Sequence, residues 1–74
     1  MVESFPVIAR YNWKVRVDTD KSMMFVNVHD DEELSDRELK DRAVLEAKRF
    51  QAELGNDVSH MEFKPIGYRL TEIN

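Results

Sequence analysis

The chain has 74 residues, with 15 acidic and 11 basic side chains, a formal net charge of −4 and no cysteine. This length predicts a single domain, residues 1–74, with one modest core and no room for a large internal active-site cavity. The lack of cysteine excludes a disulfide scaffold and a thiolate metal site, and it fits the reducing cytoplasm, where we expect the protein. The acidic balance argues against a general nucleic-acid-binding protein. No apolar run reaches the roughly 18 residues of a membrane span, so we expect no membrane partner.

An alternating pattern over residues 7–17 predicts the first β-strand. Its odd-numbered positions are mostly apolar and its even-numbered positions are mostly polar, so the strand has an inner and an outer face. Trp13 belongs to the apolar set and is expected in the core. Residues 22–29 alternate in the same way, and the polar residues 18–21 between the two runs predict a hairpin turn.

A cap and a regular apolar spacing predict a helix from about Asp36 to Leu54. Ser35 and Glu38 match a capping box, in which each side chain binds the backbone N–H of the other residue. Gly55 is a typical stop signal. One apolar stripe at helical spacing is expected to face the sheet. Its members are Leu39, Ala43, Ala47, Phe50 and Leu54.

Residues 58–72 predict the last strand. The apolar positions change parity across residues 64–67, where Pro65 has no N–H to donate, so we expect a bulge or an edge position there. The elements predict an α+β fold, a small ββαβ domain. Its three-stranded, mainly antiparallel sheet would have the strand order 2-1-3, with one helix packed on one face. The direction of the third strand stays open at this point.

Catalytic and metal-binding patterns are missing from the sequence. No serine or threonine lies in a strand-turn-helix elbow or beside an evident base, and two glycines cannot form a phosphate-binding loop. His29 and His60 fall on different predicted strands, without the short spacing typical of zinc ligands. The acidic run after His29 lacks the alternate spacing and the central glycine of a calcium loop. We therefore expect neither an enzyme nor a metal or cofactor site.

The leading hypothesis is a small non-enzymatic interaction module that binds a protein partner or a second copy of itself. Apolar residues on the outer face of the hairpin would form the contact patch, and the free edge of the second strand could extend its sheet with another chain. The acidic connection before the helix would steer the partner electrostatically. Accessory proteins, including phage-encoded inhibitors of host machinery, offer an analogy. The predicted partner-binding residues are Ile8, Met23, Phe25, Asp30, Asp31, Glu32 and Glu33.

The alternative hypothesis is a nucleic-acid-binding module. Basic side chains on the outer sheet face would neutralise phosphates, while Phe25 and Tyr68 would stack on bases. An open sheet face is also often basic without any such function. The residues of this alternative are Arg10, Lys14, Arg16, Lys64 and Arg69.

Overall fold

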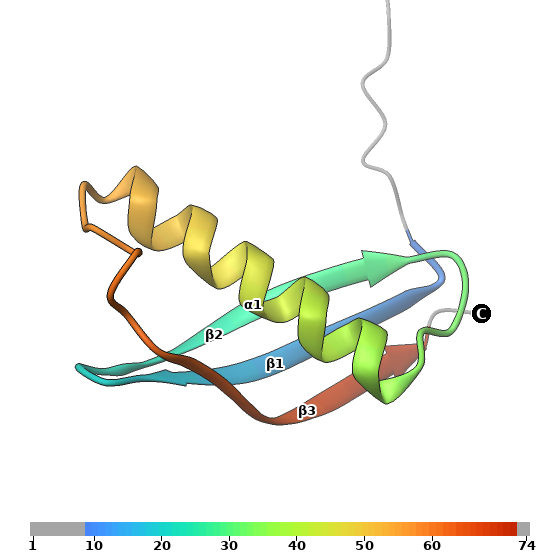
Figure 1. Cartoon of the computed structure of the whole chain (residues 1–74). Coiled ribbons are helices and arrows are strands. Elements are labelled where there is room, and N and C mark those ends of the chain that lie inside the picture. Colours follow the sequence, from blue (N-terminus) through green and yellow to red (C-terminus); the bar gives the residue numbers. More distant parts are fainter. Residues whose placement is uncertain (1–8, 73–74) are drawn as a thin grey trace, which may run out of the picture.

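The computed structural model describes residues 9–72, which form three strands and one helix. β1 (Tyr11–Thr19) and β2 (Met23–Asp30) form a hairpin, α1 (Asp36–Glu53) follows, and β3 (Phe63–Glu72) comes last. The sheet has the order β2-β1-β3, and both β2 and β3 run antiparallel to β1. The helix lies across one face of this sheet (Figure 1). The predicted α+β class, ββαβ order and strand order are therefore confirmed, and the third strand is antiparallel.

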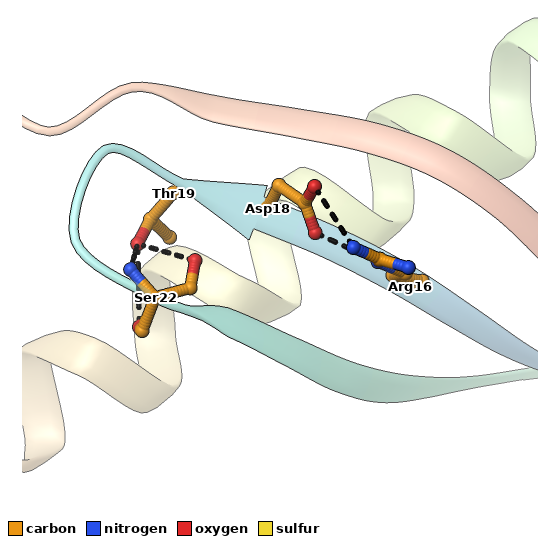
Figure 2. Close-up of polar contacts among 4 residues, drawn as sticks. All are labelled: Arg16, Asp18, Thr19 and Ser22. Carbon is orange, nitrogen blue, oxygen red and sulfur yellow. Dashed lines mark hydrogen bonds and ion pairs between the residues drawn. The ribbon is translucent and has the colours of Figure 1, made fainter.

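A tight turn closes the hairpin between β1 and β2. The backbone N–H of Thr19 donates to the carbonyl of Ser22 over 2.7 Å. The Thr19 hydroxyl accepts from the N–H of Ser22 over 2.9 Å (Figure 2). This turn fixes a register in which Val15 lies opposite Val26. Both valines are buried, because directly opposed residues of an antiparallel pair share one face of the sheet.

β1 starts later than the predicted strand of residues 7–17. Residues 7 and 8 lie outside the described residues, and Ala9 and Arg10 precede the strand. The side-chain amide of Asn12 donates to the carbonyl of Ala9 over 3.1 Å. Such a local bond to the backbone favours a bend over an extended chain. The strand therefore begins only at Tyr11.

β3 begins at Phe63, so the prediction of a strand from residue 58 is wrong for the segment before Phe63. The carboxylate of Asp57 accepts the hydroxyl of Ser59 over 2.6 Å and its backbone N–H over 3.0 Å. These two bonds, the hydroxyl bond first, lower the pKa of Asp57. An aspartate that binds the backbone two residues further on forms a turn, and this turn replaces the start of the strand.

A β-bulge interrupts β3 where the parity change predicts one. Val17 pairs with Pro65 and Arg16 pairs with Gly67, so Ile66 is the extra residue. A bulge reorients the side chains of its strand relative to the regular alternation. The expected irregularity at residues 64–67 is therefore confirmed.

The predicted capping box starts α1. Ser35 Oγ accepts the N–H of Glu38 over 3.2 Å, and Glu38 Oε1 accepts the N–H of Ser35 over 3.4 Å. At the other end, Gly55 follows the C-cap with φ +88°, a left-handed conformation that glycine adopts at low cost. The sequence signals at both ends of the helix therefore act as expected.

The predicted buried stripe of α1 is correct in its first half and wrong in its second. Phe50 is 50% exposed and Leu54 is 61% exposed, whereas Gln51 is buried. The contact with the sheet continues in steps of four residues from Leu39, and such a ridge reaches Gln51. The Gln51 amide is satisfied there, because its Oε1 accepts Asn56 Nδ2 over 2.7 Å and its Nε2 lies 3.6 Å from Met24 Sδ.

The core lies between α1 and the hairpin. Trp13 is 2% exposed, as the prediction of a core tryptophan requires, and the ring of Tyr11 stacks on it with centroids 5.8 Å apart. β3 contributes the half-buried Phe63 at its start. Within residues 9–72 no helix combines the length and the apolar character that a membrane span requires. The buried cluster consists of Trp13, Val15, Val17, Val26, Val28, Leu39, Ala43 and Ala47.

Candidate functional site

The sheet face opposite α1 is bare within the described part of the chain, and we call it the open face (Figure 1). Lys14 lies at its centre, opposite Asn27 on β2 and Arg69 on β3. At the next position of β1 that shares this face, Arg16 lies opposite Phe25. Because opposed residues share a face, the register brings cations from two strands beside an aromatic ring.

The open face is hollowed beside Phe25 and Ile66, which are each 54% exposed. The hollow has a volume of about 340 Å³. Nothing lies within 4 Å of the position that a Cβ on Gly67 would take, so the missing side chain helps to leave the hollow open. The Lys14 ammonium lies 5.4 Å from the centroid of the Phe25 ring, which is within the range of a cation–π contact. The lining residues are Lys14, Arg16, Phe25, Ile66, Gly67, Tyr68 and Arg69.

Ile66 is the residue of this site that sequence reasoning missed. As the extra residue of the bulge, it breaks the regular alternation of β3 and takes a place in the hollow beside Phe25. The signal was present in the sequence, because the change of parity across residues 64–67 predicts the bulge. The face to which a bulge turns its extra side chain depends on the local backbone, which a sequence pattern does not specify.

The cations of the open face differ in their surroundings. Arg16 forms a two-bond ion pair with Asp18, with Nε–Oδ1 at 2.9 Å and Nη2–Oδ2 at 3.3 Å (Figure 2). The hydrogen bond with Asp18, followed by its charge, raises the pKa of Arg16. Within residues 9–72, no ion pair involves Lys14 or Arg69. The hollow therefore has a positive rim on a chain of net charge −4.

The structure divides the residues predicted for partner binding. Met23 and Phe25 are exposed on the open face, and Ile8 lies outside the described residues. The acidic residues do not line the hollow. Asp30 and Asp31 instead make polar contacts at the connection between β2 and α1. Glu32 and Glu33 are exposed beside them.

Asp30 and Asp31 have structural partners within the described chain. Asp30 accepts the N–H of Glu32 over 2.9 Å and pairs with Arg42 at 2.8 Å. The backbone bond from Glu32, and after it the charge of Arg42, lower the pKa of Asp30. Asp31 Oδ1 accepts the N–H of Arg10 over 3.3 Å. These contacts give the two acids a role in the fold, and the prediction that they bind a partner stays untested.

The residues predicted for nucleic-acid binding also divide. Lys14, Arg16 and Arg69 meet at the hollow, whereas Lys64 lies opposite Asp18 and does not line it. Arg10 precedes β1 and lies over the ring of Tyr11, 5.5 Å from its centroid. Tyr68 lies opposite Val15, which is buried under α1, so its register position is on the helix side of the sheet although it borders the hollow. Of the two rings suggested for stacking, Phe25 is therefore the one with its register position on the open face.

Comparison of the chain with family models, with curated proteins and with solved structures found no match. Within residues 9–72, no group of three or more histidine or acidic side chains could hold a metal ion. His29 contacts the side chain of Asn12 through its Nδ1, and His60 is exposed in the loop before β3. The candidate site is therefore the open-face hollow, which offers apolar contact surface, an aromatic ring and a positive rim.

Proposed function

We propose that this chain is a small, cytoplasmic, non-enzymatic interaction module that binds a protein partner through its open face. The observation that supports this proposal is the hollow in which Phe25 and Ile66 are half exposed beside three cationic side chains. A single exposed apolar side chain is common on any protein, but adjoining ones around a depression are typical of contact surfaces. Aromatic residues, phenylalanine included, and arginine are also both enriched in such surfaces.

The charges favour an acidic partner over a second copy of the chain at this face. Two copies stacked face to face would bring Lys14, Arg16 and Arg69 of both together, and like charges across an interface are unfavourable. A partner with carboxylates around an apolar side chain would match both the rim and the floor of the hollow. Binding of such a partner would weaken as salt screens the charges.

Phe25→Glu tests this proposal, because it removes the apolar centre and adds a negative charge to the hollow. Fragments selected from a displayed protein-fragment library on the immobilised wild-type chain are the probes. We expect the enriched fragments to bind Phe25→Glu at least about thirtyfold more weakly than wild type, the effect of losing one central contact of 2 kcal/mol or more. Fluorescence anisotropy of the purified fragments measures the affinities.

Met23→Glu is the matched control, since Met23 lies on the same strand and face, is 56% exposed and does not line the hollow. We expect this variant to bind within about threefold of wild type, because exposed peripheral contacts contribute little. Equal losses of affinity in both variants would mean that the added negative charge alone weakens binding. That result would contradict a specific role of the hollow. A selection that enriches no fragment would also contradict the proposal.

A single-stranded nucleic acid is the second candidate ligand, favoured by the contact of the Phe25 ring with Lys14 and by the position of Phe25 opposite Arg16. Such a site combines phosphate neutralisation with base stacking. A twelve-nucleotide oligo-dT probe at low salt distinguishes it from a protein ligand. A mobility shift that Arg16→Glu abolishes, with a steep loss of affinity in salt, would favour nucleic acid. No shift at low salt would leave the protein partner as the proposal.

A further inference from the structure

We propose that the outer edge of β2, which no strand within residues 9–72 covers, is a second binding site that takes an extended peptide segment of another protein as an added strand. The segment would lie beside this edge, along the α1 side chains nearest to it. It would pair with the backbone of Met23, Phe25 and Asn27. The two sites share Phe25, which lines both the open-face hollow and the hollow beside β2, but the edge site depends on outward backbone groups of β2 that the open-face hollow does not need.

The hairpin turn determines which backbone groups of β2 point outward. Thr19 and Ser22 form a hydrogen-bonded pair, and in an antiparallel ladder such pairs alternate with pairs that make no bonds. In this register the even-numbered residues of β2 bond to β1 and the odd-numbered residues direct their N–H and C=O away from it. Arg42 supports this assignment, because its Nη1 donates from α1 to the outward carbonyl of His29 over 3.4 Å. The outward-facing residues are Met23, Phe25, Asn27 and His29.

The two edges of the sheet differ in their protection against strand addition. β3 contains Pro65, which lacks an N–H at an outward position, and a bulge beside it. β2 pairs with β1 over all of its eight residues without a shift, and it contains no proline, lysine or arginine. An outer strand without these protective features is the edge that accepts another extended chain.

Side chains of α1 and β2 line two hollows along the β2 edge. Arg42, Glu46 and Phe50 follow one another at four-residue spacing on α1 and line two adjoining hollows of about 210 and 530 Å³ along β2. Asn27 and Glu46 line both hollows, so the two hollows lie next to each other along β2 and together form the groove considered for the segment. Phe50, 50% exposed, provides an apolar contact on the helix side, and Phe25 provides one on the open face. The fitting segment is therefore extended, with an apolar side chain toward each ring.

A second copy of this chain fits the edge less well than a single strand. Antiparallel pairing of β2 with the β2 of a copy requires a two-fold axis normal to the sheet, which places both helices on the same face of the extended sheet, one on each side of the seam. The row of Arg42, Glu46 and Phe50 would then face its own copy across the seam, with like charges close together. A peptide segment brings no helix to that face.

Asn27→Pro tests the site, because proline has no backbone N–H to donate to an added strand. It removes an outward N–H and leaves the bonds between β2 and β1 in place, and Asn27→Ala is the matched control that keeps the N–H. The probes are decapeptides enriched from a displayed random library on the wild-type chain. We expect their affinity to be about tenfold or more lower for Asn27→Pro than for Asn27→Ala, because both variants lack the Asn27 side chain and only the proline lacks the N–H.

A second pair of variants keeps the test decisive if Asn27→Pro does not fold, as judged by circular dichroism. Phe50→Glu alters the groove from the helix side, and Leu45→Glu places the same charge on α1 at a residue that is 58% exposed and lines neither hollow. Of these two variants, we expect only Phe50→Glu to weaken the binding of the decapeptides.

Equal binding of the decapeptides to all variants, or a selection that enriches no peptide, overturns the proposal. So does a wild-type dimer in light scattering that Asn27→Pro converts to a monomer, because the edge would then belong to a second copy. Phe25 lines both sites, whereas Asn27 and Phe50 do not line the open-face hollow, so Asn27→Pro and Phe50→Glu decide the edge proposal separately from the open-face proposal.

Discussion

Replacing Trp13 by alanine is expected to lower the free energy of unfolding by about 3–5 kcal/mol. The side chain is 2% exposed and packs within the cluster between α1 and the hairpin. Its loss removes a large apolar area and leaves a cavity that the surrounding valines fill only in part. A chain of this size has a total stability of only about 4–11 kcal/mol, so we expect a variant that is largely unfolded at moderate urea concentrations. Urea denaturation followed by circular dichroism measures the change.

Phe25→Ala is the control for this prediction, because it removes an aromatic ring from the opposite face of the same sheet. The ring is 54% exposed, and we expect a change within about 0.5 kcal/mol. A Trp13→Ala variant as stable as Phe25→Ala would reverse the assignment of the inner and outer faces. The open-face hollow would then be part of the core.

Ala43→Leu is expected to lower the free energy of unfolding by about 1–3 kcal/mol. Ala43 and Ala47 are both fully buried, one helical turn apart, on the side of α1 that packs against the sheet. Their small side chains let the helix approach the sheet closely. A leucine at this position must push α1 away or force neighbouring side chains out of their preferred rotamers. Urea denaturation and the near-ultraviolet signal of Trp13 report both effects.

Ala52→Leu is the matched control, since it makes the same substitution at an exposed position of α1. We expect it to change stability by less than about 0.5 kcal/mol. If Ala43→Leu proves neutral or stabilising, the contact between α1 and the sheet is looser than the burial of the two alanines indicates.

The sequence predicted the fold well where local patterns and tertiary packing agree. The alternation around Trp13 assigned the two faces of β1, and Ser35 and Gly55 marked the ends of α1. The second half of the helix stripe was wrong, because the ridge that meets the sheet ends on Gln51, whose amide is satisfied by Asn56. The apolar spacing predicted Phe50 as the buried residue instead. A satisfied buried amide is a tertiary feature that hydrophobicity alone does not reveal.

The candidate site was predictable in part. The alternation of β1 places Lys14 and Arg16 on the outer face, and the predicted hairpin adds Phe25. The contribution of β3 depended on its antiparallel direction and on the bulge, which bring Arg69 and Ile66 to the same hollow. Periodicity predicts the bulge, but it specifies neither the direction of β3 nor the face to which the extra residue turns, so Ile66 was not placed beside Phe25.

The measurement that most directly tests the account is nuclear magnetic relaxation of the free protein with a soluble paramagnetic agent. The central claim is that the open face is bare and available for binding. We therefore expect strong broadening of the side-chain signals of Phe25, Ile66 and Arg69, and little effect on Val15 and Ala47. Protection of Phe25 equal to that of Val15 would contradict the claim, because the face would then already be covered in solution.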